Sequence, residues 1–305
     1  MKMIQLCSGR VVMLVSVLLW LFLGWSSYNV LASEPTFADC KAWIQAHQGF
    51  DFPNHGCEKQ AGVLKTVREA GGGFIPIDAG RFFIVWFPDD WNKQRNKRLI
   101  VALHGSGGCA ERMFKFWHVM RSRHSFAVAA VQYAEVDAAG NLRFDDSARI
   151  YELLRATLNQ LKSHCPLDGV PVVLYGFSKG SARTFELAAM DRAPEGMKAF
   201  SAFISDSGAV FAEYQGQLSP FLQHLGPSAY RGAHFWLYCG GKDHGGRTCR
   251  GMKRMAHFVR AHGGTVDRFY THPPGGHGIF ITGRPQRLGG ALTALFDYIN
   301  QLGNQ

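Results

Sequence analysis

The order of strand-like and helix-like segments constrains this chain most. From Phe74 onward, short runs of β-branched and aromatic residues alternate with longer amphipathic segments. We expect strands at 82–87, 98–103, 125–133, 170–175, 199–204, 234–238 and 266–270, and helices at 112–122, 146–164, 181–190, 248–261 and 288–302. Strands separated by helices pair in parallel through right-handed crossovers. The sequence therefore predicts an α/β fold with a doubly wound, mostly parallel sheet and flanking helices.

The amino-terminal segment is predicted to be a targeting signal that is not part of the fold. Its only charges are those of Lys2 and Arg10, and an apolar run occupies 11–25. Val30 and Ala32 are placed like a small-residue cleavage site, so we expect cleavage after Ala32. Residues 33–305 would then be exported to the periplasm or the extracellular space, without stable insertion in a membrane. An uncleaved membrane anchor over 11–31 is the alternative.

The remaining chain has the size and composition of one globular domain, which we place at 33–305. It contains no linker or internal repeat, and 47% of all residues are hydrophobic against 18% charged. The net charge of +10 could attract an acidic polymer, nucleic acid or an anionic membrane. Because the basic residues are scattered along the sequence without a nucleic-acid motif, we expect no nucleic-acid partner. The sequence leaves the oligomeric state open.

Cysteine usage indicates disulfide bonds. One of the seven cysteines, Cys7, lies in the signal, and an even number remains in a chain sent to an oxidising compartment. The local pairs Cys40 with Cys57 and Cys239 with Cys249 are favoured, and Cys109 and Cys165 then pair or stay free. Six cysteines allow 15 connectivities, so the pairing stays open at this point.

A serine follows one of the predicted strands in a glycine-flanked turn. The segment 176–180, Gly-Phe-Ser-Lys-Gly, matches the pattern G-x-S-x-G between the strand at 170–175 and the next helix. Such a turn needs small residues on both sides of the serine because the neighbouring backbones approach closely. We predict that Ser178 is a nucleophile; a plain helix-capping serine is the alternative.

A second glycine-rich loop follows the strand at 98–103. Its sequence, His-Gly-Ser-Gly-Gly over 104–108, has little side-chain bulk and can point backbone N–H groups at a developing oxyanion. We assign these donors to Ser106, with Gly107 as the alternative, and to Lys179. The loop also fits the dinucleotide pattern G-x-G-x-x-A. No acidic residue closes the next strand, however, and that interpretation leaves the serine turn unexplained, so we expect no cofactor.

The acid and base of a hydrolytic site should follow the serine, each after its own strand. Asp243 follows the strand at 234–238, and the glycine-flanked His277 precedes the last helix. Asp206 is the alternative acid. His244 and His272 are weaker candidates for the base, interpreted as structural or surface histidines. A metal site built from the late histidines and cysteines has no H-E-x-x-H or C-x-x-C spacing, so no metal is predicted.

With these motifs the chain resembles the α/β-hydrolases, and more loosely the exported esterases of the polyhydroxyalkanoate-depolymerase and feruloyl-esterase group. The resemblance covers about 74–302, and Lys179 departs from the small or uncharged residue common at its position. It implies a serine esterase without cofactor, in which Ser178 attacks a carbonyl, His277 moves the proton and Asp243 orients His277.

Two further expectations concern the substrate. The apolar insertion at 211–231 is predicted to form a short lid or wall over the acyl pocket. The substrate is a small-molecule or polymeric carboxylic ester; a polyester, thioester or peptide bond remains open, as does a binding protein that keeps the fold without turnover.

Overall fold

A computed structural model describes residues 34–49, 61–78, 80–120, 126–208, 210, 217–277 and 285–302. The account below concerns the unit Pro35–Gln305. The predicted signal segment lies outside the described residues. Among the helices of the described chain, none has both the length and the apolar character needed to cross a bilayer.

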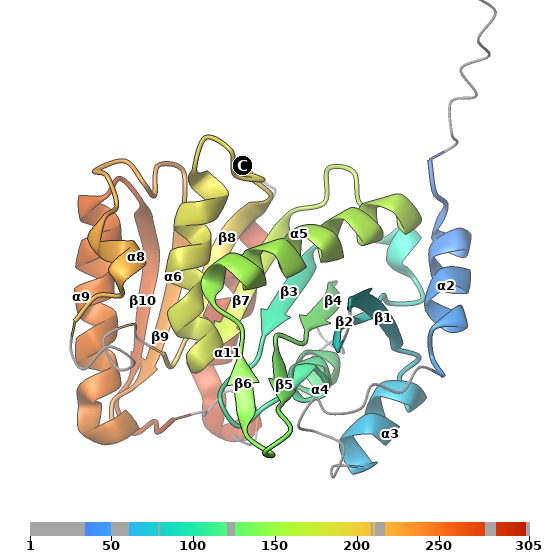
Figure 1. Ribbon diagram of the computed structural model, residues 1–305, viewed down its shortest axis with the longest axis horizontal. Coiled ribbons are helices and arrows are strands. Elements are labelled where there is room, and N and C mark those ends of the chain that lie inside the picture. Colours follow the sequence, from blue (N-terminus) through green and yellow to red (C-terminus); the bar gives the residue numbers. More distant parts are fainter. Residues whose placement is uncertain are drawn as a thin grey trace, which may run out of the picture. The chain divides into compact units, whose positions relative to one another are not determined.

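One large sheet forms the centre of this unit (Figure 1). Its strands lie in the order β1-β2-β4-β3-β7-β8-β9-β10. Their bounds are β1 Gly73–Asp78, β2 Arg81–Trp86, β3 Leu99–Leu103, β4 Ala127–Val131, β7 Val172–Phe177, β8 Phe200–Asp206, β9 His234–Gly240 and β10 Thr265–His272. The β1–β2 and β2–β4 pairs are antiparallel and the other pairs are parallel. The predicted doubly wound, mostly parallel sheet is confirmed.

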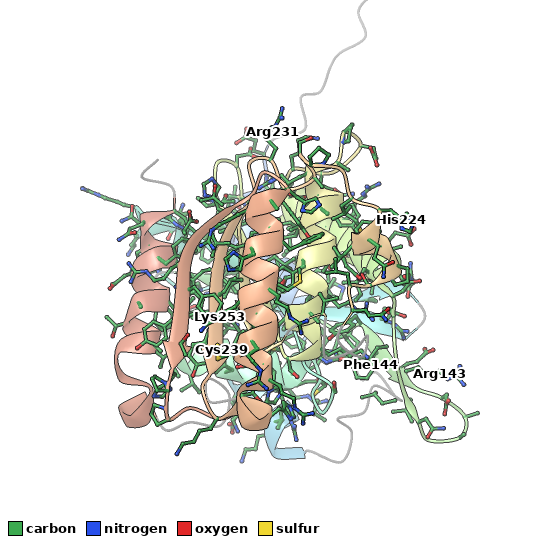
Figure 2. The ribbon with its side chains drawn as sticks, turned by 90° about the vertical axis from the view of Figure 1, so that its left-hand side faces the viewer. Arg143, Phe144, His224, Arg231, Cys239 and Lys253 are labelled. Atoms are coloured by element: carbon green, nitrogen blue, oxygen red, sulfur yellow. A yellow bond between two sulfur atoms is a disulfide. The ribbon has the colours of Figure 1, made fainter. Side chains whose placement is uncertain are left out.

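Helices cover both faces of the sheet. They are α2 Phe37–Ala46, α3 Ala61–Glu69, α4 Ala110–Met120, α5 Ser147–His164, α6 Lys179–Arg192, α8 Pro220–Gln223, α9 Arg247–Ala261 and α11 Pro285–Gln301, with short 3-10 turns η1 Trp91–Lys93 and η3 Asp243–Gly246. One apolar cluster joins the sheet to α2, α5, α6 and α9, and a second joins its other face to α3, α4 and α11. Figure 2 views these layers from the side of α9 and β10.

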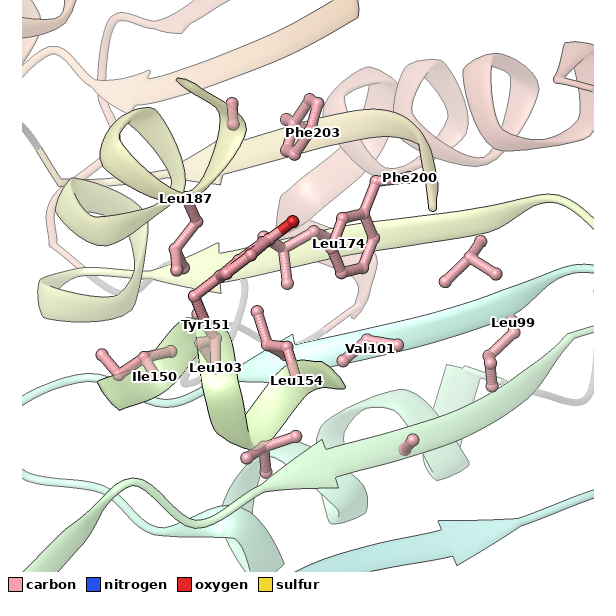
Figure 3. Close-up of a cluster of buried hydrophobic side chains, with 14 of the residues drawn as sticks. Leu99, Val101, Leu103, Ile150, Tyr151, Leu154, Leu174, Leu187, Phe200 and Phe203 are labelled. Carbon is pink, nitrogen blue, oxygen red and sulfur yellow. The ribbon is translucent and has the colours of Figure 1, made fainter. Parts of the chain in front are cut away.

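The side chains of β3 show how a central strand serves both clusters. Leu99, Val101 and Leu103 belong to the first cluster, and Ile100 and Ala102 belong to the second. Successive side chains of a strand point to opposite faces, so a strand covered by helices on both sides is apolar throughout. Figure 3 shows the first set beside residues of α5 and the neighbouring strands.

A two-stranded hairpin, β5 (Ala134–Val136) and β6 (Leu142–Phe144), projects between β4 and α5. The Asp137 carboxylate closes its turn by accepting the Ala139 and Asn141 N–H groups at 3.0 and 2.9 Å. At its base the buried Arg81 guanidinium contacts Asp145 through two hydrogen bonds of 2.7 and 2.8 Å. A paired Arg of this kind holds the hairpin in one orientation.

The sequence does not predict β1, α2, α3 or the hairpin. These elements are short or lie before the regular alternation, so local periodicity gives little signal for them. The predicted strands and helices are present, with ends displaced by a few residues, as caps and turns determine where elements end. For example, Asp146 is the N-cap of α5 and its side chain accepts the Arg149 N–H.

The disulfide prediction is partly wrong. Cys239 bonds to Cys249 as expected, but Cys40 bonds to Cys165, 125 residues away, and not to Cys57. The physical reason is that α2 packs beside the end of α5, which places both sulfurs in one buried cluster. Cys109 is also disulfide-bonded, and Cys57 lies outside the described residues.

The predicted lid is not supported by the described part of the insertion. Leu222 is buried in the first apolar cluster, and the Tyr230 hydroxyl donates to the Phe185 carbonyl of α6 at 3.0 Å. This segment thus packs on the helical layer through Leu222 and Tyr230, while Phe221 is exposed. Residues 211–216 lie outside the described part.

Candidate active site

Ser178 lies on the turn between β7 and α6, with φ of 53° and ψ of −109°. A Cβ on Gly176 would lie 2.3 Å from the carbonyl oxygen of Gly180, and one on Gly180 would lie 2.7 Å from that of Leu103. Both positions therefore require glycine. The positive φ of a non-glycine residue is uncommon and is maintained here by the close packing around it. The turn presents the Ser178 hydroxyl beyond the end of the sheet.

The loop after β3 packs against this turn. A Cβ on Gly105 would lie 2.9 Å from the Cβ of Ser178. The His104 carbonyl accepts the Gly180 N–H at 3.2 Å and also the Tyr133 hydroxyl. These contacts hold the loop beside Ser178, so that the backbone of the loop faces the serine.

The loops after β9 and β10 are joined to each other. The Gly241 N–H donates to the His272 carbonyl at 2.7 Å, and the Lys242 N–H donates to the Gly275 carbonyl at 2.8 Å. Because β9 and β10 are parallel neighbours, both loops leave the same edge of the sheet. Asp243 and His277 are therefore held close together although 34 residues separate them.

Three side chains form a continuous hydrogen-bonded chain at this edge. The distance from Ser178 Oγ to His277 Nε2 is 2.9 Å, and that from His277 Nδ1 to Asp243 Oδ2 is 3.0 Å. The Asp243 side chain is fully buried and His277 is partly exposed. The hydrogen bond to Asp243 raises the pKa of His277 above its usual value, against the opposing effect of burial. The arrangement can move a proton from a hydroxyl to an imidazole that a carboxylate orients.

Comparison with known proteins adds to this geometry. No family model and no curated protein matches the sequence. Among solved structures, an esterase from Rhizomucor miehei has a TM-score of 0.59 at 12% identity, covering 90% of this chain and 99% of that chain. Est1E from Butyrivibrio proteoclasticus has a TM-score of 0.52 at 13% identity, covering 77% and 99%. A putative dienelactone hydrolase from Klebsiella pneumoniae has a TM-score of 0.55 at 13% identity, covering 77% of this chain and 98% of that chain.

The chain has the α/β-hydrolase fold. The predicted fold class is confirmed by this likeness and by the sheet order. In this α/β-hydrolase fold, Ser178, Asp243 and His277 come together as the motifs indicate; their catalytic roles remain predictions.

Asp206, the alternative acid, occupies a different position. It ends β8, its backbone carbonyl accepts the Ser178 N–H at 2.8 Å, and its carboxylate accepts the Tyr175 and Ser207 hydroxyls at 2.7 and 2.8 Å. Burial raises its pKa to about 7, although these hydrogen bonds oppose the shift. The His277 ring contacts Asp243 and not Asp206. The role of Asp206 is therefore to hold the serine turn through its backbone carbonyl.

A pocket with a volume of about 440 Å³ opens at Ser178. The predicted donors Ser106 and Gly107 line it, and its lining is mainly apolar. Lys179, the first residue of α6, supplies its backbone N–H next to the serine, while its Nζ lies 4.5 Å from the centre of the Phe144 ring in β6. The Lys179 side chain, which is unusual at this position of the motif, therefore carries its ammonium group to the β5–β6 hairpin.

Sequence reasoning does not identify Arg112 and Met113 of the pocket wall, and it interprets His244, which also lines the pocket, as a structural or surface histidine. His244 Nε2 lies 3.6 Å from the Asp243 Oδ1, and its ring centre is 5.1 Å from that of His277. Its position directly after Asp243 is what made it a candidate in the sequence. His272 instead contacts the Tyr238 hydroxyl at 3.2 Å.

The late cysteines and histidines considered for a metal site lie in separate places in the structure. The late cysteines Cys239 and Cys249 are bonded to each other. Within the described residues, Asp243, His244 and His277 place one ligand atom each within 4.8 Å of one another. Two of these groups already belong to the hydrogen-bonded chain with Ser178, so binding of a metal ion there would compete with it.

Proposed function

We propose that this chain is a serine hydrolase that cleaves carboxylic esters through an acyl-enzyme intermediate. The observation that carries the proposal is the chain from Ser178 Oγ through His277 to the buried Asp243, with distances of 2.9 and 3.0 Å. The esterases among the structural neighbours support the class of reaction, and Est1E has been solved with ferulic acid bound.

The first half of the reaction transfers the acyl group to the enzyme. Ser178 Oγ attacks the ester carbonyl while His277 Nε2 takes its proton, and Asp243 stabilises the imidazolium. Backbone N–H groups of Lys179 and of Ser106 or Gly107 stabilise the oxyanion. His277 then returns the proton to the departing alcohol as the carbon–oxygen bond breaks.

The second half releases the acid. A water molecule donates a proton to His277 as it attacks the acyl carbonyl, and the collapse of the second tetrahedral intermediate returns that proton to Ser178. No cofactor takes part in either half. The apolar pocket beside Ser178, with Met113 and Phe177 in its wall, accommodates the acyl group.

We propose further that residues 33–305 act as one exported domain after removal of the signal. The disulfides Cys40–Cys165 and Cys239–Cys249 support an oxidising compartment. Fractionation of cells that express the full chain would test this: the mature protein should begin at Ser33 and lie outside the cytoplasm. Retention of residues 1–32 on the mature protein would contradict it.

A hydrolysis panel tests the proposed reaction. p-Nitrophenyl esters of graded acyl length, an aryl thioester and a peptide anilide are offered to the parent and to Ser178→Ala. We expect ester turnover by the parent and a loss of about a thousandfold or more in the variant. Circular dichroism of the variant controls for folding. A folded Ser178→Ala protein that retains the parent rate would overturn the proposal.

A further inference from the structure

The Asp243 carboxylate uses only one of its two oxygens in the hydrogen-bonded chain with Ser178. Its Oδ2 lies 3.0 Å from His277 Nδ1. Its Oδ1 is buried and has no hydrogen-bond partner among the described residues. A buried charged oxygen without a partner is unfavourable, because it has lost its water and gained no contact in exchange. Asp243 Oδ1 is therefore a place where a bound cation would be stabilised.

The His244 ring lies beside this oxygen. His244 Nε2 is 3.6 Å from Asp243 Oδ1, just outside hydrogen-bond distance, and the ring centre is 5.1 Å from that of His277. The backbone of His244 has φ of 44° and ψ of 44°. This left-handed conformation is uncommon for a residue other than glycine, and one observed in a loop next to a reactive group indicates a function.

The turn that holds His244 is fixed on both sides. Gly245 and Gly246 also have left-handed backbone angles, with φ of 63° and 76°. Cys239, which Figure 2 labels, bonds to Cys249 and so joins the strand before the turn to the helix after it. The structure thus keeps the His244 ring next to the acid that directly precedes it in the sequence.

Asp243, His244 and His277 together have the composition of a zinc ligand set. Each offers one ligand atom within 4.8 Å of the other two, and no other three His, Cys, Asp or Glu side chains in the described ranges do so. Zinc binds imidazole nitrogen and carboxylate oxygen at about 2.0–2.2 Å, which places tetrahedral ligand atoms about 3.4 Å apart. The distances of 3.0 and 3.6 Å from Asp243 to the two rings are close to this spacing.

We propose that Asp243, His244 and His277 form an inhibitory zinc site, an effect that rests on the proposed ester hydrolysis. One carboxylate oxygen and one nitrogen of each ring bind the ion, and water occupies the fourth position. The His244 side chain is 61% exposed and lines the pocket, so the ion enters from solvent. We call these three residues the zinc site.

Coordination by either nitrogen of His277 removes the base that Ser178 needs. Zinc at Nε2 occupies the lone pair that accepts the Ser178 proton. Zinc at Nδ1 leaves the ring proton on Nε2, which then donates and cannot accept. In both cases acyl transfer stops before the Ser178 Oγ attacks, and removal of the ion returns His277 Nδ1 to Asp243.

The ligand types favour zinc over the hard divalent cations. Calcium takes six to eight oxygen ligands and magnesium keeps an octahedral shell of oxygens, whereas this site has two nitrogens and one carboxylate. Arg112 lines the same pocket, and Arg247 Nε donates to the His244 carbonyl at 3.1 Å. These positive charges oppose a cation, so we expect reversible binding that a chelator removes.

Binding is measured on untagged protein that has been treated with EDTA. Calorimetry with Zn²⁺ gives the affinity and the number of ions per chain, and the visible absorption of Co²⁺ reports the ligand set. The test variant is His244→Asn, because asparagine tolerates the left-handed backbone and lacks the ring. The matched control is His257→Asn, which removes an exposed histidine of α9. Circular dichroism checks the folding of both.

We expect one ion per chain in the parent and in His257→Asn. Zinc affinity of His244→Asn should fall by about tenfold or more, because even the loss of a group that only orients a ligand costs that much. The Co²⁺ absorption of the parent should show nitrogen and oxygen ligands in a tetrahedral site. In His244→Asn this absorption should be lost at the same Co²⁺ concentration.

Inhibition is measured with p-nitrophenyl acetate, after subtraction of the rate with zinc alone. Saturating Zn²⁺ should lower kcat of the parent by about a hundredfold or more, because the base is lost. Excess EDTA should restore the rate, and Ca²⁺ or Mg²⁺ should leave it unchanged. Each rate is divided by that of the same protein without metal, so a different basal rate of His244→Asn does not enter. Half-inhibition of this variant should need about tenfold more zinc or more.

Equal zinc affinity of the parent and His244→Asn would overturn the inference, because the ion would then bind elsewhere. Activation by zinc would also overturn it, in favour of a metal that takes part in turnover. Calorimetry of Ser178→Ala, with and without His244→Asn, separates the two proposals. Zinc binding that depends on His244 there supports the zinc site even if the chain hydrolyses no ester. Ester turnover that saturating zinc leaves unchanged refutes the inhibitory site while the proposed function stands.

Discussion

Ser178 has a backbone conformation that its neighbours impose. Gly176 and Gly180 leave room for the turn. Gly208 also packs against it, because a Cβ on Gly208 would lie 1.9 Å from the Ser178 carbonyl oxygen. The G-x-S-x-G spacing predicts the first two glycines because the pattern is local. It does not predict Gly208, whose contact with the serine arises only when β8 pairs with β7.

Replacement of the buried acid tests which carboxylate serves the histidine. Asp243→Asn should lower kcat by about a thousandfold or more, because the imidazolium loses its partner. The acid limb of the kcat/KM profile should move to lower pH, since the hydrogen bond to Asp243 raises the pKa of His277 and the neutral imidazole is the active form. A profile measured between pH 5 and 9 checks this, and an unmoved acid limb would count against Asp243.

The same measurement on Asp206→Asn is the control, with kcat/KM expected within a few-fold of the parent.

The contribution of Asp206 to stability should depend on pH, and Asp206→Asn should remove that dependence. The folded Asp206 has a pKa of about 7 against 3.8 for the ordinary carboxyl, so the folded state keeps a proton that the unfolded state has lost. Stability from this group is complete below the unfolded pKa and falls as pH rises toward 7. Between pH 5 and 8 the parent should lose about 2–3 kcal/mol relative to the variant. Urea unfolding at both pH values measures the difference, and parallel behaviour of the two proteins would refute it.

The pocket wall contains residues that the sequence does not predict. Arg112 and Met113 are adjacent on α4, and only Met113 belongs to the apolar core. Both line the pocket because the start of α4 lies beside the loop 104–108. Their helix periodicity is the same as for ordinary surface and core residues, so no local pattern distinguishes them.

Two neighbouring elements hold the acid. Cys239 at the end of β9 bonds to Cys249 in the first turn of α9, and η3 with Asp243 lies between them. Within η3, His244 and Gly245 have left-handed backbone angles, with φ of 44° and 63°. The disulfide encloses this irregular turn, which indicates that it maintains the position of Asp243.

Removal of this disulfide should affect turnover. Cys239→Ser with Cys249→Ser should lower kcat several-fold, because Asp243 moves relative to His277. The unfolding free energy should fall by about 3 kcal/mol or less, as the enclosed loop is short. Kinetics and urea unfolding on one preparation measure both effects. Unchanged kcat in a folded variant would show that the loop holds Asp243 without the bond.

The strands and helices were predictable in proportion to their length and burial. The strand β3 and the helix α5 have continuous apolar character or clear helical spacing, so their types follow from the sequence. The hairpin strands β5 and β6 have three residues each. Their stability comes from the turn at Asp137 and from Arg81, contacts that periodicity does not encode.

At the scale of the whole unit, long-range contacts decide what the sequence leaves open. Cys40 precedes the sheet and Cys165 ends α5, and the fold of all intervening strands brings them together. Local spacing favours near neighbours, which explains the wrong pairing of Cys40 with Cys57.

The Cys40–Cys165 bond should matter for stability and not for turnover. Cys40→Ser with Cys165→Ser opens a loop of 125 residues, for which the chain-entropy model gives a loss of up to about 5 kcal/mol. The kcat on an aryl ester should stay within about twofold, because neither cysteine approaches the pocket. A loss of kcat without a loss of unfolding free energy would contradict this assignment.

Covalent labelling tests the central claim most directly, because it requires a hydroxyl that the neighbouring imidazole activates. The folded protein is treated with a fluorophosphonate probe, and the labelled peptide is mapped by mass spectrometry. The account predicts one label per chain on Ser178, much slower labelling of His277→Ala and none of Ser178→Ala at that position. A folded parent that stays unlabelled, or carries the label on a different residue, would contradict it.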